Sequence, residues 1–133
     1  MTIQRNVFVK NHYSAIRFAG GLESDVLVEH NTFVTNGVGS SLPSRSEINV
    51  DDAGGAAGTQ IVGNLFEVGT ALINDCYDGA SKGFAFGDNF VHGAIPAGAK
   101  GSCVGAQTLG DPMLSADLHP AAAAAAPYGA FSP

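Results

Sequence analysis

A short motif of the form apolar-x-x-Asn-x-apolar recurs four times along this 133-residue chain and constrains its fold more than any other feature. Successive asparagines of the motif are 25, 33 and 25 positions apart. Recurrence at a nearly constant period is the signature of a solenoid, in which each repeat buries its apolar face against the next repeat. The four copies are Ile3–Phe8, Val28–Phe33, Ile61–Phe66 and Phe86–Val91.

The recurring asparagine has a physical role in such a stack. At a bend between two strands, its side chain can bond backbone groups that the turn would leave unpaired. Stacked repeats bring equivalent positions about 4.8 Å apart, so each amide can donate to one neighbour and accept from the other. We therefore predict a structural asparagine ladder, not a ligand site, formed by Asn6, Asn31, Asn64 and Asn89.

A second asparagine follows the first after five positions in two of the copies, at Asn11 and Asn36. Gly69 and Ala94 stand at the corresponding positions of the third and fourth copies. The second asparagine therefore recurs in the first two copies of the motif only.

The remainder of each repeat is also typical of short strands. Further apolar stretches occupy residues 15–18, 47–50 and 71–74, without helical periodicity. We predict an all-β fold, a right-handed parallel β-helix of about four coils over residues 1–108, followed by a C-terminal capping segment over 109–133 in the same domain. A β-sandwich would need hairpins every 8–12 residues. The hairpin dipeptide Asn-Gly occurs once, at Asn36–Gly37, and a sandwich gives no reason for an asparagine every 25 residues.

The composition excludes several classes of protein. Hydrophobic residues make up 45% of the chain and charged residues 14%, which is too apolar for a disordered segment. The 18 glycines favour tight turns between short strands. A net charge of −6, with six scattered basic residues, argues against binding to nucleic acid or to an anionic membrane surface. The N-terminus lacks the basic and then apolar layout of a secretory signal.

The repeats and the C-terminal part together resemble the right-handed parallel β-helix proteins of the pectate-lyase-like superfamily, whose coils carry such Asn-x-Phe strands. The segments Leu109–Leu114, Asp117–Pro120 and Tyr128–Phe131 look like the closing segment of many such domains. A run of six alanines, Ala121–Ala126, departs from the family pattern, and we expect a short helical or irregular cap there. The resemblance implies a polysaccharide lyase, an epimerase, a hydrolase or a binding relative, and it favours an extracellular or periplasmic location.

The beginning of the chain also departs from the family, because it starts inside a strand at Met1–Ile3 without a cap. An uncapped solenoid end presents unpaired backbone groups and apolar core. We therefore expect either that further coils precede this chain or that two copies meet end to end as a homo-oligomer.

Enzymes of this superfamily usually place their site on the outer face of one sheet, and the corresponding outward positions here would be Arg17, Asn49 and Leu72. The resemblance implies that a basic residue, Arg17 or a lysine, abstracts the C5 proton of a uronate, and Arg17 is the catalytic candidate. Oxygen-bearing side chains just beyond the strands could bind substrate, and three carboxylates could hold Ca²⁺, which prefers oxygen ligands. The substrate-binding candidates are Asn49, Asp51, Asn74 and Asp75, and the calcium candidates are Asp51, Asp52 and Asp75. All of them could equally be turn residues, since Asp and Asn favour the ends of strands.

Two hypotheses about function remain. The first is a carbohydrate-associated β-helix module with polysaccharide as its partner and Ca²⁺ as its candidate cofactor. The alternative is a non-catalytic structural module that associates through its uncapped N-terminal end. Cys76 and Cys103 could pair across neighbouring coils or remain as small buried hydrophobic residues.

Overall fold

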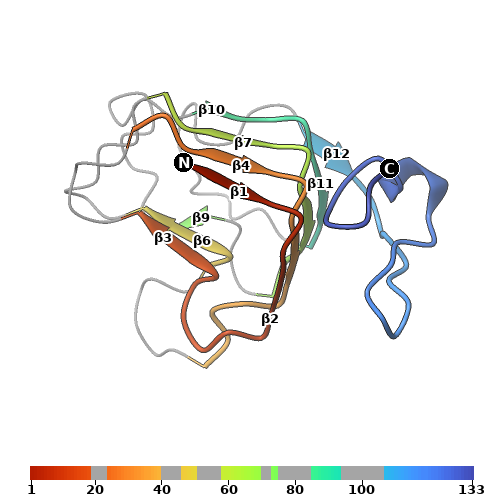
Figure 1. Cartoon of the computed structure of the whole chain (residues 1–133). Coiled ribbons are helices and arrows are strands. Elements are labelled where there is room, and N and C mark those ends of the chain that lie inside the picture. Colours follow the sequence, from red (N-terminus) through yellow and green to blue (C-terminus); the bar gives the residue numbers. More distant parts are fainter. Residues whose placement is uncertain (19–23, 40–45, 51–57, 70–72, 75–84, 94–106) are drawn as a thin grey trace.

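A computed structural model describes residues 1–18, 24–39, 46–50, 58–69, 73–74, 85–93 and 107–133 (Figure 1). The described residues form short strands and a single turn of 3-10 helix at Ala123–Ala125. This confirms the expectation of an all-β fold. No helix in the described part of the chain is long and apolar enough to cross a membrane.

The strands of the described residues build three sheets, and the neighbouring strands in these sheets are parallel. Sheet A has the order β1 (Thr2–Gln4), β4 (Leu27–Glu29), β7 (Gln60–Val62) and β10 (Ala85–Phe86). Sheet B has the order β12 (Gln107–Leu109), β11 (Asn89–His92), β8 (Leu65–Glu67), β5 (Thr32–Val34) and β2 (Val7–Val9). Sheet C has the order β3 (Ile16–Phe18), β6 (Ile48–Val50) and β9 (Ile73–Asn74). The chain thus visits sheets A, B and C in turn and then returns to A, an order compatible with a parallel β-helix (Figure 1).

A sharp bend of two residues turns the chain from sheet A into sheet B on each pass. The residue before each motif asparagine has a left-handed backbone, with φ between 50° and 67°. This conformation is uncommon for residues other than glycine, so its recurrence shows that the bend has the same geometry on every pass. These residues are Arg5, His30, Gly63 and Asp88.

The asparagine after each of the first three bends donates to the asparagine of the next pass. Nδ2 of Asn6 lies 3.1 Å from Oδ1 of Asn31, and Nδ2 of Asn31 lies 3.1 Å from Oδ1 of Asn64. Nδ2 of Asn64 lies 3.0 Å from Oδ1 of Asn89. The backbone N–H of each donating asparagine also points at the same Oδ1, at 2.9–3.0 Å. The asparagines therefore satisfy the polar groups of the bend and hold adjacent passes in register.

Aromatic side chains fill the space between the sheets. The rings of Phe8, Phe33 and Phe66 stack along sheet B, with centroids 5.0 Å and then 4.6 Å apart. The ring of Phe86, on sheet A, also packs against Phe66, and their ring centroids are 5.7 Å apart. Ile48 of sheet C is fully buried in the same core. The parallel register places equivalent large side chains on top of one another, so one core runs through all passes.

The C-terminal segment, residues 110–133, lies along the outer side of sheet B (Figure 1). Its Ala125 is fully buried against Leu65 and Phe90, which point outward from sheet B. We expected this segment to close the last coil, beginning at residue 109. Residue 109 is the last residue of β12, and the contacts of the following residues run back along sheet B.

Four hydrogen bonds show how far back the segment reaches. Gly129 donates to the carbonyl of Gly63 at 3.0 Å, and Ala130 donates to Oγ1 of Thr32 at 3.0 Å. Further on, Ser132 bonds the ring of His30 at 2.8 Å, and its carbonyl accepts from the Arg5 guanidinium at 2.8 Å. The described segment therefore ties the first three passes together from outside.

The ladder predicts that its inner asparagines contribute more to the free energy of unfolding than its outer ones. Asn64 is fully buried, and its replacement by alanine would leave the Asn31 N–H and the carbonyls of Val28 and Val62 without this partner. We expect Asn64→Ala to lower the free energy of unfolding by about 3 kcal/mol and Asn6→Ala, at the exposed end, by about 1 kcal/mol. Urea denaturation measures both values. Equal losses for the two variants would contradict a ladder whose strength depends on burial.

Candidate functional site

Three of the predicted site residues lie in one row on sheet C. The register of β3 with β6 pairs Arg17 with Asn49, and the register of β6 with β9 pairs Asn49 with Asn74. The prediction from the repeats was wrong at one position of this row, because it placed Leu72 beside Asn49. The register pairs Ile48 with Ile73, which brings Asn74 to this position instead.

Within this row, Arg17 is exposed to solvent, whereas Asn49 is buried. Arg17 is exposed between the buried Ile16 and Phe18, as expected for the outward position of a strand. Asn49 was also expected to be exposed, yet its side chain retains 5% exposure. Its Oδ1 is buried and has no hydrogen-bond partner in the described part of the chain. A large ligand could therefore reach Arg17 directly, whereas Asn49 would need a local opening.

The acidic candidates beyond the row lie outside the described residues. This applies to Asp51, Asp52 and Asp75, and also to Cys76 and Cys103. Among the residues that the structure does describe, no three His, Cys, Asp or Glu side chains gather as they would around a metal ion. The calcium site remains a prediction from the sequence.

The ladder asparagines are engaged in the interior. Asn31, Asn64 and Asn89 are fully buried, and Asn6 lies at the exposed end of the stack. Their amides are used by backbone and side-chain bonds between passes. They hold adjacent passes in register at the bend between sheets A and B.

The second, shorter ladder ends in a carboxylate. Nδ2 of Asn11 donates to Oδ1 of Asn36 at 2.7 Å, and Nδ2 of Asn36 donates to Oε2 of Glu47 at 2.6 Å. Glu47 thus supplies the acceptor that an asparagine at position 69 would have supplied, and its Oε1 also accepts from the Gly69 N–H at 3.4 Å. This role of Glu47 could not be predicted from the repeat, because Glu47 stands eleven positions after Asn36, outside the repeat period.

Glycine at position 69 explains why the second ladder ends in a carboxylate and not in a third asparagine. A Cβ at Gly69 would lie 3.0 Å from Cα of Thr35, and closer still to its Cγ2. A side chain at position 69 would therefore force the two passes apart. The acceptor has to come from another segment, and Glu47, immediately before β6, provides it.

Glu47 is an unusual group to bury. Its side chain is fully buried, and the loss of solvating water raises the pKa of its carboxyl from 4.5 to about 7. The N–H donors of Asn36 and Gly69 oppose this increase in pKa, and the negative charge of Glu67 adds to it. A carboxyl in such surroundings changes its charge near neutral pH.

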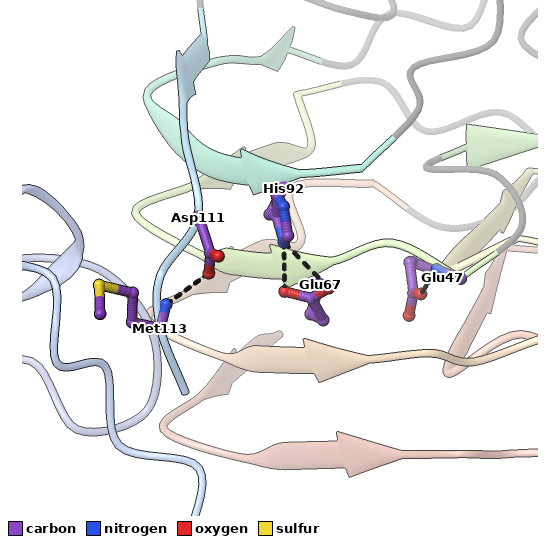
Figure 2. A network of polar contacts seen from close by, with 6 residues as sticks. Glu47, Glu67, His92, Asp111 and Met113 are labelled. Atoms are coloured by element: carbon purple, nitrogen blue, oxygen red, sulfur yellow. Dashed lines mark hydrogen bonds and ion pairs between the residues drawn. The ribbon is translucent and has the colours of Figure 1, made fainter. Parts of the chain in front are cut away.

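A second polar pair lies on the outer face of sheet B. Nδ1 of His92 on β11 lies 2.8 Å and 3.0 Å from the two carboxylate oxygens of Glu67 on β8 (Figure 2). The hydrogen bond with Glu67 raises the pKa of His92, burial opposes this increase, and the negative charges of Glu67 and Asp111 add to it. Asp111 stands beside the pair, and its Oδ1 accepts from the Met113 N–H at 2.7 Å (Figure 2).

The carboxylate of Glu67 orients the imidazole ring of His92. The side chains of His92 and Glu67 are 40% and 31% exposed, so solvent screens their attraction. Because the pKa of His92 is raised, its charge persists to higher pH, and the stabilisation from the pair fades as the pH rises through that pKa. The sequence contained a signal for it, since Glu67 and His92 are 25 positions apart, the period of the ladder.

Comparison with protein-family models, with curated proteins and with solved structures finds no significant match to this chain. The fold and the side-chain arrangement of the described residues are therefore the basis of the functional proposal.

Proposed function

We propose that this chain is a right-handed parallel β-helix of about four coils and that it serves as a carbohydrate-associated module. It would belong to a polysaccharide lyase, epimerase or hydrolase of the pectate-lyase-like kind, or to a binding relative. Three parallel sheets visited in a fixed order support the architecture, together with the asparagine ladder. The right-handed sense follows the strong preference of connections between parallel strands.

The row on sheet C is the observation that carries this proposal. The strand register places Arg17, Asn49 and Asn74 of three successive passes at equivalent positions, so the row combines the residue types arginine and asparagine. A guanidinium fits a carboxylate with two parallel hydrogen bonds, and amides bond to hydroxyl groups. A row with a spacing of about 4.8 Å between passes can follow an extended chain of acidic sugars.

The proposed role of Arg17 is to bind the carboxylate of a uronate. A guanidinium stays charged at every physiological pH, so it is a poor base for the C5 proton. Binding at this position also fits its exposure between two buried neighbours. Asp51, Asp52 and Asp75, which follow the strands of the row in the sequence, would hold Ca²⁺ against the same carboxylate.

Isothermal titration with polygalacturonate, alginate and a glycosaminoglycan, each with Ca²⁺ and with a chelator, tests the proposal. We expect heat of binding with at least one of them and a loss of roughly tenfold in affinity for Arg17→Gln. Lys10→Gln removes the same charge at the bend after β2 and should bind as the wild type does. Absorbance of the unsaturated uronate would show lyase activity. No heat with any of these polymers, with or without calcium, would overturn the proposal.

A second candidate function is association through the first pass. The strands β1, β2 and β3 are each at the edge of their sheet. Val7 and Val9 on β2 are 39% and 40% exposed, which is high for valine in a strand. An edge strand of this kind offers backbone groups and apolar area to another chain, and we propose a second copy as its partner.

Sedimentation of the protein across the micromolar range tests this second function. We expect a concentration-dependent dimer that dissociates in the variant Val7→Lys/Val9→Lys, because charges on an edge strand oppose pairing. Glu29→Gln, on β4 inside sheet A, is the control that should still associate. A wild-type monomer at all concentrations would exclude association through this edge.

A further inference from the structure

The core-facing row of sheet B ends in an exposed leucine. Across the five strands of this sheet, the register aligns Phe8, Phe33, Phe66, Val91 and Leu109. Phe33 and Phe66 are fully buried and Val91 is 1% exposed, whereas 67% of Leu109, on the last strand β12, is exposed. The apolar row is therefore open at the β12 edge of the sheet.

The side chain of Leu109 belongs to the core face of the sheet and not to its outer face. The hydroxyl of Thr108 lies 3.1 Å from that of Tyr128, in the C-terminal segment on the outer side of sheet B, so Thr108 points outward. Successive side chains of a strand point to opposite faces, and Leu109 is therefore directed toward the core. Its register partner Val91 is a member of the buried core, which agrees with this orientation. Leu109 is thus a core position at the end of the stack.

The opposite edge of sheet B presents the other end of the same row. This edge is β2, whose Phe8 stacks on Phe33 with ring centroids 5.0 Å apart and is itself partly exposed. All strands between β2 and β12 are parallel, so the two edge strands run in the same direction. A second copy of the chain could therefore place its β2 next to β12 as one more parallel strand, with Phe8 over Leu109.

The direction of the asparagine ladder favours this order of copies. Each ladder amide donates toward the later pass, beginning with Asn6, which donates to Asn31. Among the hydrogen bonds of the described residues, none is accepted by Oδ1 of Asn6. This oxygen suits a donor from a preceding pass, and Gln107, which the register places beside Asn89, carries a side-chain amide. Two first passes placed against each other would instead bring two acceptors together.

We propose that copies of this chain associate head to tail, with β2 and Phe8 of one copy placed on β12 and Leu109 of another. The inference rests on the second candidate function, association through the first pass, and names the surface of the partner that receives this pass. The contact uses different surfaces on the two copies, so each complex keeps one free Leu109 end and one free first pass. A dimer is therefore the first member of an open series of longer oligomers.

Sedimentation of two blocked variants, alone and mixed, tests the proposal. Leu109→Lys places a charge at the β12 end and leaves the first pass intact, whereas Val7→Lys/Val9→Lys does the reverse. We expect the wild type to form dimers and then longer oligomers as its concentration rises, and each variant alone to remain a monomer. An equimolar mixture of the two variants should form a one-to-one dimer that does not grow further.

Met113→Lys is the matched control. It places the same charge on another apolar side chain, which is 62% exposed and belongs to the C-terminal segment on the outer side of sheet B (Figure 2). This variant should associate as the wild type does.

The outcomes separate the inference from the function on which it rests. If Leu109→Lys alone associates as the wild type does, the first pass does not bind the β12 end, which overturns the inference and leaves association through the first pass standing. Association of Val7→Lys/Val9→Lys alone, or a mixture that stays monomeric, would also overturn the head-to-tail contact. A wild type that is monomeric at all concentrations would remove both proposals.

Amide hydrogen exchange of the wild type provides a test that needs no variant, in case Leu109→Lys does not fold. We compare a dilute sample with one concentrated enough to associate, and we expect the amides of β2 and β12 to gain protection together. Protection gained on β2 without any gain on β12 would overturn the inference.

Discussion

The amide-to-amide hydrogen bonds of the asparagine ladder are the interaction on which the rest of the structure depends. Each pass of the chain has to bend sharply, and each bend places polar backbone groups in the interior. Asn31 and Asn64 satisfy those groups and bond to the next pass through the same side chain. An asparagine side chain can do this because it carries both a donor and an acceptor. A slip of one residue would move these amides out of the interior and break every rung at once.

The second ladder shows what happens when the same geometry cannot use asparagine. Gly69 has no room for a side chain against Thr35, so the amide of Asn36 meets a carboxylate from a different segment. The junction that results is well satisfied in hydrogen bonds but sensitive to charge. The outer C-terminal segment adds a third kind of connection, since it binds residues of several passes from outside the core. The described structure is therefore held together by links between passes as well as by its apolar interior.

The sequence was informative where the repeat was regular. The period of the motif predicted the strands on either side of each asparagine, because stacking requires equivalent residues at equivalent positions. The same period would have paired Glu67 with His92, had it been applied to polar residues. It was less informative on sheet C, where insertions change the spacing, and Leu72 was aligned with Asn49 in place of Asn74. Periodicity cannot fix a register when the intervening lengths differ.

Two features of the candidate site could not be derived from the sequence for other reasons. The burial of Asn49 depends on what surrounds β6 in three dimensions, and the alternation of a strand does not specify this. The role of Glu47 depends on steric exclusion at Gly69, which is a property of two passes together. Arg17 was the simpler case, because an arginine between two apolar residues of a strand has to point outward.

The central claim is that the passes stack in parallel through the asparagine ladder, and nuclear Overhauser contacts in solution test it most directly. We expect contacts from the Phe33 ring to the rings of both Phe8 and Phe66, and from the Asn31 amide proton to the Asn64 side chain. Close contacts between Hα protons of directly opposed strands, which arise in antiparallel pairs, should be missing among these residues. Strong Hα–Hα contacts between β2 and β5, with no contact from Phe33 to Phe8, would contradict the account.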